Sequence, residues 1–256
     1  MNAVLLAVLF VGGAVLYAVV GVLVGRKIVR HHVAEGHNDV AVPVFLTAGV
    51  IYAVLLGFMV IAEWESYHAA HTNTGEEAAI LVPLYRQTTV MPEEQGREMR
   101  HAIREYTEHV VQGWGRFQAG QRNVRAGHDV NEIYRIFAKQ APANKAGEIV
   151  AAEFMQTLSK MIFYRNKRYV HAAESLSWIM WLGAIGGGVI TVGLTFLLFM
   201  ERWWPHVIVS SVMAALIGML LVILALVSRP FVGPLAIHPE PFEQTLAVFD
   251  DVDKGN

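Results

Sequence analysis

Four long apolar segments dominate the hydropathy pattern of this chain. They cover residues 3–24, 43–62, 178–200 and 207–228, and none of them contains Asp, Glu, Lys or Arg. A helix rises about 1.5 Å per residue, so each segment is long enough to cross a hydrocarbon layer about 30 Å thick. The pattern therefore predicts an integral membrane protein with four transmembrane helices.

A polar segment of residues 63–177 separates the second span from the third. It holds 14 of the 20 basic and 14 of the 22 acidic residues. We therefore expect an all-α membrane protein with a helical soluble domain inserted between spans two and three. The predicted domains are residues 1–62 with two spans, 63–177 in water, 178–228 with two spans, and a tail of 229–256.

The soluble segment is predicted to begin as an extension of span two. No helix-breaking Gly-Pro pair follows this span, so its helix is expected to continue over about 40 residues to near Pro83. A second helix over residues 93–119 is predicted from an apolar stripe with spacings of three and four. The stripe consists of Ile103, Tyr106, Val110 and Trp114.

Two further helices complete the predicted soluble domain. Asn131 is expected to cap a short helix that ends at residues 141–142, because Asn side chains accept hydrogen bonds from a first helical turn. From Lys145 the pattern predicts one unbroken helix that enters the membrane near Trp178. Its apolar face would hold Phe154, Leu158, Met161 and Ile162.

Composition narrows the classes of function. The chain is 54% hydrophobic and 16% charged, and its net charge of −2 gives no support to a nucleic-acid partner. It contains no cysteine, which excludes disulfides, thiolate metal sites and thiol nucleophiles. The basic cluster Arg26, Lys27 and Arg30 follows the first apolar segment instead of preceding it, so we expect a retained span and not a signal peptide.

Metal and enzyme chemistry receive little support. The pairs Glu65/His68 and Glu98/His101 each place two possible ligands on one helix face, as in helical di-iron sites. If the chain reverses near residue 91, however, the pairs lie roughly 20 Å apart along the helix axes. No zinc-protease motif, phosphate-binding loop or nucleophile elbow is found. We expect no metal, no cofactor, no catalytic residues and no enzyme activity.

Span two has two different faces that suggest a pore. Small residues form one face suited to close helix packing, at Gly49, Ala53 and Gly57. Another face combines apolar side chains with a carboxylate at its end, at Ile51, Leu55, Phe58, Ala62 and Glu65. A ring of such helices would enclose an apolar constriction followed by an acidic mouth. Contact of these side chains with lipid or with span four is the alternative.

Several short motifs resemble the bestrophin-like domain family of bacterial membrane proteins. They include His37-Asn38-Asp39-Val40, the run from Tyr52 to Phe58, Glu63-Trp64-Glu65-Ser66-Tyr67, Glu77-Ala78 and Leu84-Tyr85-Arg86. The end of the chain is similar as well, at Arg229-Pro230-Phe231-Val232-Gly233-Pro234 and Pro241-Phe242. Where the family has an acidic residue before a tryptophan and a proline after it, this chain has Gln112-Gly113-Trp114-Gly115.

The resemblance implies four spans and a cytoplasmic middle domain. By analogy to bestrophins, which are pentameric anion channels, it also implies that span two lines a pore. Glu65 on that face would repel anions. The positions that match the motifs and are expected to be structural are Trp64, Tyr85, Arg86, Arg165, Arg168, Pro230, Phe231 and Gly233.

We therefore predict a multi-pass protein of the bacterial inner membrane that forms a homo-oligomer, favoured as a pentamer, and conducts small ions. A non-conducting scaffold or accessory subunit, whose soluble helices bind a protein partner, is the alternative. A third hypothesis is a pH sensor based on His31, His32 and His37, since imidazole titrates near neutral pH. Basic residues near the spans do not settle the orientation, because the two opposite topologies have nearly equal counts.

Overall fold

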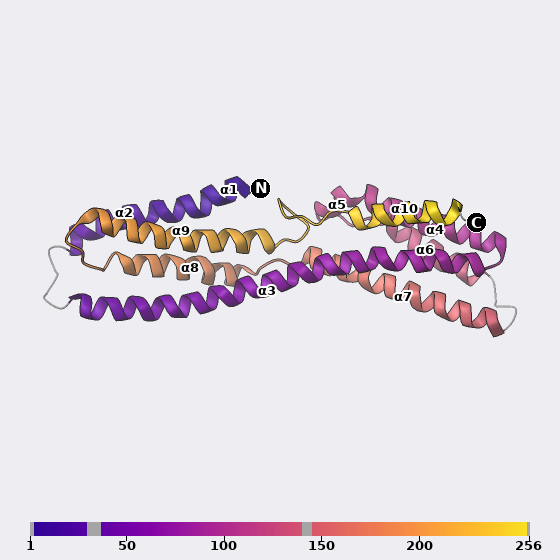
Figure 1. Cartoon of the computed structure of the whole chain (residues 1–256), viewed down its shortest axis with the longest axis horizontal. Coiled ribbons are helices and arrows are strands. Elements are labelled where there is room, and N and C mark those ends of the chain that lie inside the picture. The colour runs from indigo at the N-terminus through magenta and orange to yellow at the C-terminus, as the bar shows by residue number, and fades with distance from the viewer. Residues whose placement is uncertain (1–2, 30–36, 140–144, 255–256) are drawn as a thin grey trace. The chain divides into compact units, whose positions relative to one another are not determined.

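The computed structural model describes residues 3–29, 37–139 and 145–254, which form helices with no β-strand among them (Figure 1). The all-α fold class is thus confirmed. The chain divides into two compact units. Unit 1 consists of Met1–Tyr67, Ser175–Arg229 and Gly233–Leu235, and unit 2 of His68–Glu174, Pro230–Val232 and Ala236–Asn256. Arg30, His31 and His32 of the sequence predictions lie outside the described residues.

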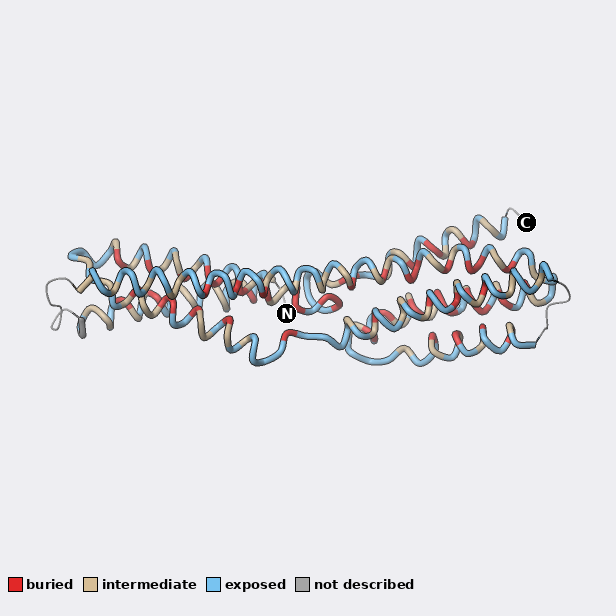
Figure 2. Tube along the Cα trace, turned by 90° about the horizontal axis from the view of Figure 1, so that it is seen from below, coloured by how far each residue is buried: buried red, intermediate tan, exposed pale blue. Residues whose placement is uncertain are grey.

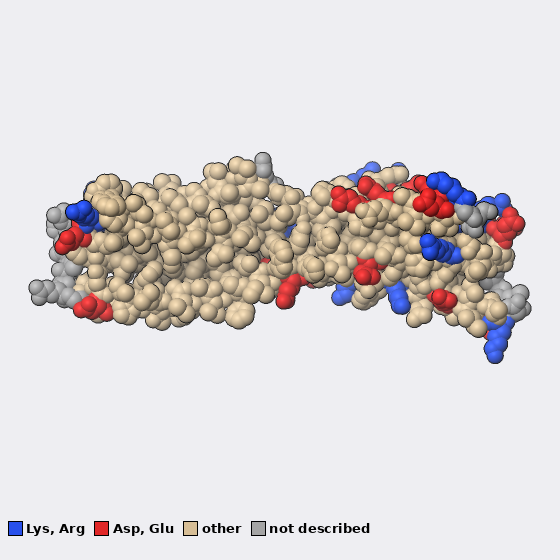
Figure 3. All heavy atoms as spheres, viewed as in Figure 1, with Lys and Arg blue, Asp and Glu red and all other residues tan. Residues whose placement is uncertain are grey.

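Unit 1 is built from four helical segments that are long and apolar enough to span a membrane, as predicted. The first comprises α1 (Ala3–Ala7), the π-helical turn η1 (Val8–Gly12) and α2 (Gly13–Val29). The others are the first part of α3 (His37–Gln87), α8 (Trp178–Thr195) and α9 (Trp203–Val227). In the view of Figure 3, charged atoms of this unit lie at its ends and the surface between them is uncharged.

Helix α3 packs on α8 through one large aromatic side chain. Tyr52 of α3 is buried, and its hydroxyl donates a hydrogen bond of 2.7 Å to the carbonyl oxygen of Ala184. A Cβ atom at Gly187 would lie 2.5 Å from the Tyr52 ring, so only glycine leaves room for it. Glycine at this position thus lets the tyrosine ring of α3 pack directly against the backbone of α8.

Polar side chains satisfy the backbone where α8 ends. The connection that follows α8 has carbonyl groups without helical partners, and away from water these groups need others. Arg26 donates to the carbonyl oxygens of residues 200 and 201 at 2.8 and 3.0 Å. The Asn38 side chain donates a hydrogen bond to the carbonyl oxygen of Phe199 and accepts one from its amide, both at 2.9 Å. His37 lies 2.9 Å from the carbonyl oxygen of Leu197.

Unit 2 is a helical bundle whose buried positions lie on the inner faces of its helices (Figure 2). It contains the rest of α3, the short 3-10 helix η2 (Thr88–Val90), α4 (Glu93–Gln112), α5 (Trp114–Gln118), α6 (Val124–Ala138), α7 (Lys145–Ala173) and α10 (Glu240–Lys254). The predicted stripe of Ile103, Tyr106, Val110 and Trp114 is buried, which confirms that face.

Two predicted helix ends within unit 2 differ from the structure. Helix α3 does not end near Pro83 but at Gln87, because Leu84 and Tyr85 beyond the proline are buried and their packing offsets the missing amide hydrogen. The helix predicted over residues 93–119 breaks at Gly113 into α4 and α5.

Two predicted helix starts are also wrong. The cap of α6 is Asn123 and not Asn131, since the Asn123 side chain accepts a hydrogen bond of 3.2 Å from the amide of Ala126. Residues 141–142, where this helix was expected to end, lie outside the described residues. Helix α7 does not continue into the third span but ends at Ala173, and α8 starts anew with Ser177 as its cap.

Candidate functional site

The candidate pore face of α3 is exposed in the single chain. Ile51, Leu55 and Phe58 are 67%, 46% and 69% exposed, and Ala62 and Glu65 are exposed as well. Their spacing of three and four residues places all five on one side of the helix. Leu55 is partly covered by α8, since a Cβ atom added at Gly183 would lie 4.0 Å from its Cδ2 atom, whereas the other four residues of the stripe are exposed.

The rest of the circumference of α3 in unit 1 consists of one packed face and further exposed surface. Tyr52, Leu56 and Met59 are buried in the unit 1 core. A Cβ atom added at Gly49 or Gly57 would meet no atom within 4 Å outside its own helix, so the small-residue face is also uncovered within the described chain. Val50, Val54 and Ile61 lie between these two faces and are exposed as well, so most of the circumference of this span is available to lipid or to another subunit.

The free stripe ends at an aromatic and acidic segment. Trp64 is 55% exposed, and its ring stacks on Tyr67 with centroids 6.1 Å apart. The Tyr67 hydroxyl donates a hydrogen bond of 2.9 Å to the carbonyl oxygen of Leu235. Glu65 is exposed and forms no ion pair with any described residue, so its carboxylate is free to act on nearby ions.

A buried ion pair lies at the centre of unit 2. Arg168 of α7 donates two hydrogen bonds to Glu77 of α3, from Nε to Oε2 at 2.7 Å and from Nη2 to Oε1 at 2.9 Å. Tyr106 of α4 donates a third, at 2.6 Å, to Glu77 Oε1. The exposed fractions of the Arg168 and Glu77 side chains are 2% and 0%. Three helices therefore meet at one carboxylate that water does not reach.

Aromatic rings enclose the guanidinium group of this pair. Its Cζ atom lies 4.7 to 5.7 Å from the centroids of four rings, those of Phe117, Tyr169, Trp114 and Phe242. Phe231 packs on Trp114 and Phe117, with centroid distances of 6.2 and 5.0 Å. Ring faces attract cations, and this attraction strengthens away from water. The cage thus replaces part of the hydration that Arg168 loses.

Protonation in the core follows from this geometry. Burial alone would lower the pKa of Arg168, but the adjacent Glu77 carboxylate raises it more, and the net pKa is above its ordinary value. Burial, followed by the charge of Glu77, raises the pKa of Tyr106 well above its usual range. The phenol therefore stays neutral and remains a hydrogen-bond donor to Glu77.

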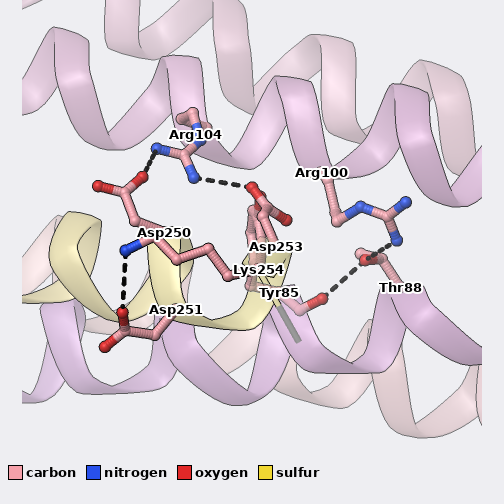
Figure 4. Close-up of polar contacts among 8 residues, drawn as sticks. All are labelled: Tyr85, Thr88, Arg100, Arg104, Asp250, Asp251, Asp253 and Lys254. Atoms are coloured by element: carbon pink, nitrogen blue, oxygen red, sulfur yellow. Dashed lines mark hydrogen bonds and ion pairs between the residues drawn. The ribbon is translucent and has the colours of Figure 1, made fainter. Parts of the chain in front are cut away.

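The C-terminal helix α10 binds α3 and α4 through a second network (Figure 4). The Tyr85 ring stacks on Phe249 with a centroid distance of 4.0 Å, and its hydroxyl donates to Asp253 at 2.7 Å. Arg104 donates to Asp250 at 2.7 Å and to Asp253 at 2.9 Å. A stacked pair covered by an arginine and two carboxylates thus fixes the tail helix to unit 2.

The other predicted motif residues occupy varied positions. Arg86 is exposed, whereas Arg165 is half-buried and lies 5.2 Å from the Tyr169 ring. Pro230 is buried, and its carbonyl oxygen accepts a hydrogen bond of 2.8 Å from Ile237. Gly233 has a φ of 100°, a backbone conformation that side chains with a Cβ rarely adopt, so the turn after α9 requires glycine there.

The sequence interpretation did not identify Glu77 as the partner of Arg168. A signal was present, because Glu77 belongs to a helical stripe with spacings of four, three, four and three whose other members are buried. These members are Ala70, Thr74, Leu81 and Leu84. A carboxylate within such a stripe predicts a buried cationic partner. Among the described residues no group of three or more His, Asp or Glu could hold a metal ion.

Together these features define a helical membrane protein with a second unit organised around a buried Glu–Arg pair. The profile of the bestrophin-like domain matches residues 12–242, and the chain belongs to this family. Comparison with curated proteins found no match.

Solved structures of low sequence identity share the fold. Two crystal structures of variants of a bacterial bestrophin homologue from Klebsiella pneumoniae are each 12% identical to the chain. They have TM-scores of 0.73 and 0.74 and cover 96% of this chain and 98% of theirs. A third crystal structure, of a membrane protein, is 13% identical with a TM-score of 0.74, covering 95% of this chain and 98% of its own.

Removal of one partner of the buried pair should strongly destabilise the protein. Glu77→Gln leaves the Arg168 charge buried without a counter-ion, and we expect a loss of about 3 to 5 kcal/mol. Thermal unfolding of the detergent-solubilised protein measures the change. The control is Glu132→Gln, which breaks an ion pair with Arg135 on the surface of α6, where exposed pairs contribute about 0 to 1 kcal/mol. Equal melting temperatures of the two variants would contradict a structural role of the pair.

Arg104→Ala should loosen the tail helix without unfolding unit 2. It removes two partly exposed ion pairs, each worth about 0.2 to 1 kcal/mol, and the cover over the Tyr85–Phe249 stack. We expect faster amide hydrogen exchange across residues 240–254. Arg97→Ala is the control, because Arg97 is an exposed arginine of α4 without an ion pair to any described residue. Unchanged exchange in α10 would show that the polar network does not fix the tail.

Proposed function

We propose that this protein forms a ring-shaped homo-oligomer, with five copies as the favoured number, which conducts small ions across the bacterial inner membrane. The observation that carries the proposal is the exposed stripe of α3, apolar from Ile51 to Ala62. It ends at the carboxylate of Glu65, which has no ion-pair partner in the described part of the chain. Membership of the bestrophin-like family supports it, since bestrophins themselves are channels.

A ring of five α3 helices has dimensions suitable for an ion pathway. Neighbouring helix axes about 8 to 10 Å apart would lie about 7 to 8.5 Å from the symmetry axis. Side chains reach about 5 to 6 Å from a helix axis, which leaves a passage of about 1 to 3 Å in radius. Ile51, Leu55 and Phe58 would form this narrow apolar neck, and such constrictions close by expelling water.

The other free face of α3 would serve the assembly. Gly49, Ala53 and Gly57 lie about 160° around the helix from the pore stripe, at about 100° per residue, and so would face away from the axis. Small residues there let an outer helix of a neighbouring subunit approach closely. In this arrangement the helices of residues 63–177 form a water-facing domain on the cytoplasmic side, and no residue is assigned a catalytic role.

A single cysteine in the proposed neck provides the decisive test. The chain contains no cysteine, so Leu55→Cys introduces a unique thiol. We expect a water-soluble, charged thiol reagent to reduce ion flux through proteoliposomes of this variant by more than half. The matched control is Leu216→Cys on α9, a leucine 58% exposed that would face lipid, where thiols stay protonated and unreactive.

Two results would reject the pore. One is flux of the unmodified protein no greater than that of empty vesicles, together with a native mass that corresponds to a single copy. The other is equal sensitivity of the two cysteine variants to the reagent. The first result would instead support the non-conducting scaffold.

The charge at the mouth should bias the permeant ion. A ring of Glu65 carboxylates attracts cations and repels anions, with an effect that salt screens. Glu65→Lys should raise the anion-to-cation permeability ratio by roughly twofold or more, measured from the reversal potential in a salt gradient. Glu94→Lys on α4 makes the same change of charge outside α3 and should leave the ratio unchanged. A ratio insensitive to Glu65→Lys would place Glu65 away from the pathway.

A further inference from the structure

Unit 2 contains a cavity that takes no part in the features described so far. Its volume is about 600 Å³, and it lies between the end of α4, α5, the loop of residues 119–123 and the first turn of α6. Pockets of about 300 to 1,000 Å³ are typical of sites for small molecules. The cavity is therefore large enough for an organic ligand or a polyatomic anion.

The lining of this cavity is strongly basic. It includes Arg116, Arg122 and Arg125 and contains no Asp or Glu. None of the three guanidinium groups forms a hydrogen bond or ion pair with any described residue, in contrast to Arg104, Arg135 and Arg168. Gln112 and Gln121 add side-chain amide groups that can donate further hydrogen bonds.

The backbone that presents these arginines is held in place. Asn123 donates a hydrogen bond of 2.6 Å to the carbonyl oxygen of His109 and also caps α6. The amide of Gln121 donates to the carbonyl oxygen of Arg116 at 2.9 Å. The loop between α5 and α6 is thus tied at both ends, which lowers the entropy that a ligand must overcome on binding.

We propose that this cavity binds a soluble small molecule with clustered phosphoryl groups. Guanidinium groups bind phosphoryl oxygens through two parallel hydrogen bonds, and three arginines without counter-ions among the described residues can neutralise several oxyanion charges. A single chloride-sized ion would leave most of the volume and two of the arginines unused. The site is separate from the pore stripe of α3 and does not depend on ion conduction.

Binding of inorganic tripolyphosphate to the purified full-length protein tests the proposal. We expect saturable binding by calorimetry, weakened at least tenfold in the variant Arg122→Ala/Arg125→Ala. Arg97→Ala/Lys160→Ala removes the same net charge from exposed positions outside the cavity and should bind as the wild type does. Arg122→Lys/Arg125→Lys keeps the charge but loses the planar fork, and should still weaken binding.

Two kinds of result would overturn the proposal or change the identity of the ligand. Absence of binding to the wild type, or equal weakening in both alanine variants, would overturn the proposal. Native mass spectrometry distinguishes a lipid headgroup from a soluble ligand. Equal numbers of phospholipids retained by the wild type and by Arg122→Ala/Arg125→Ala support the soluble ligand. Phospholipid lost only from that variant would assign the cavity to headgroups and overturn the soluble assignment.

Discussion

The buried pair of Glu77 and Arg168 is the constraint on which unit 2 depends. Neither charge can stay away from water without the other, so α3 and α7 must meet at this point for the unit to fold. Tyr106 brings α4 to the same carboxylate. Phe242, from the C-terminal segment, belongs to the ring cage over the guanidinium group. Parts of the chain that lie far apart in sequence are therefore needed together to keep water from two charges.

Unit 1 is stabilised by close packing of its helices instead of by paired charges. In a bilayer the hydrophobic effect does not drive helices together, and close packing with hydrogen bonds takes its place. The Tyr52 ring against Gly187 and its bond to Ala184 are such contacts. The same unit leaves two faces of α3 largely exposed. The proposed ring of subunits would account for both faces and for a carboxylate at the end of an apolar stripe.

The fold class and the four spans were predictable because they depend on length and on the absence of charge. Both are local properties of the sequence. Helix ends were predicted less well, since they depend on single contacts. Asn123 and Asn131 are equally good caps by residue type, and only the bond of Asn123 to the end of α4 selects the first. The break between α7 and α8 has no proline or glycine to signal it.

The candidate site was predictable to different degrees. The stripe from Ile51 to Glu65 follows from helical periodicity alone, although its role remains a proposal. Arg168 was singled out by a family motif, but its partner lies 91 residues away in sequence. Hydropathy could not pair the two, because the pairing is set by how α3 and α7 pack in space. The arginine-lined cavity was missed for the same reason, since its walls come from three helices and a loop.

The fit of Tyr52 against Gly187 links the permitted sizes of two side chains. A larger residue at position 187 occupies the space of the ring, so it can be accommodated only if position 52 becomes smaller at the same time. The hydroxyl that binds Ala184 would then be lost as well. A change of size at either position alone therefore leaves a clash or a cavity at this helix contact.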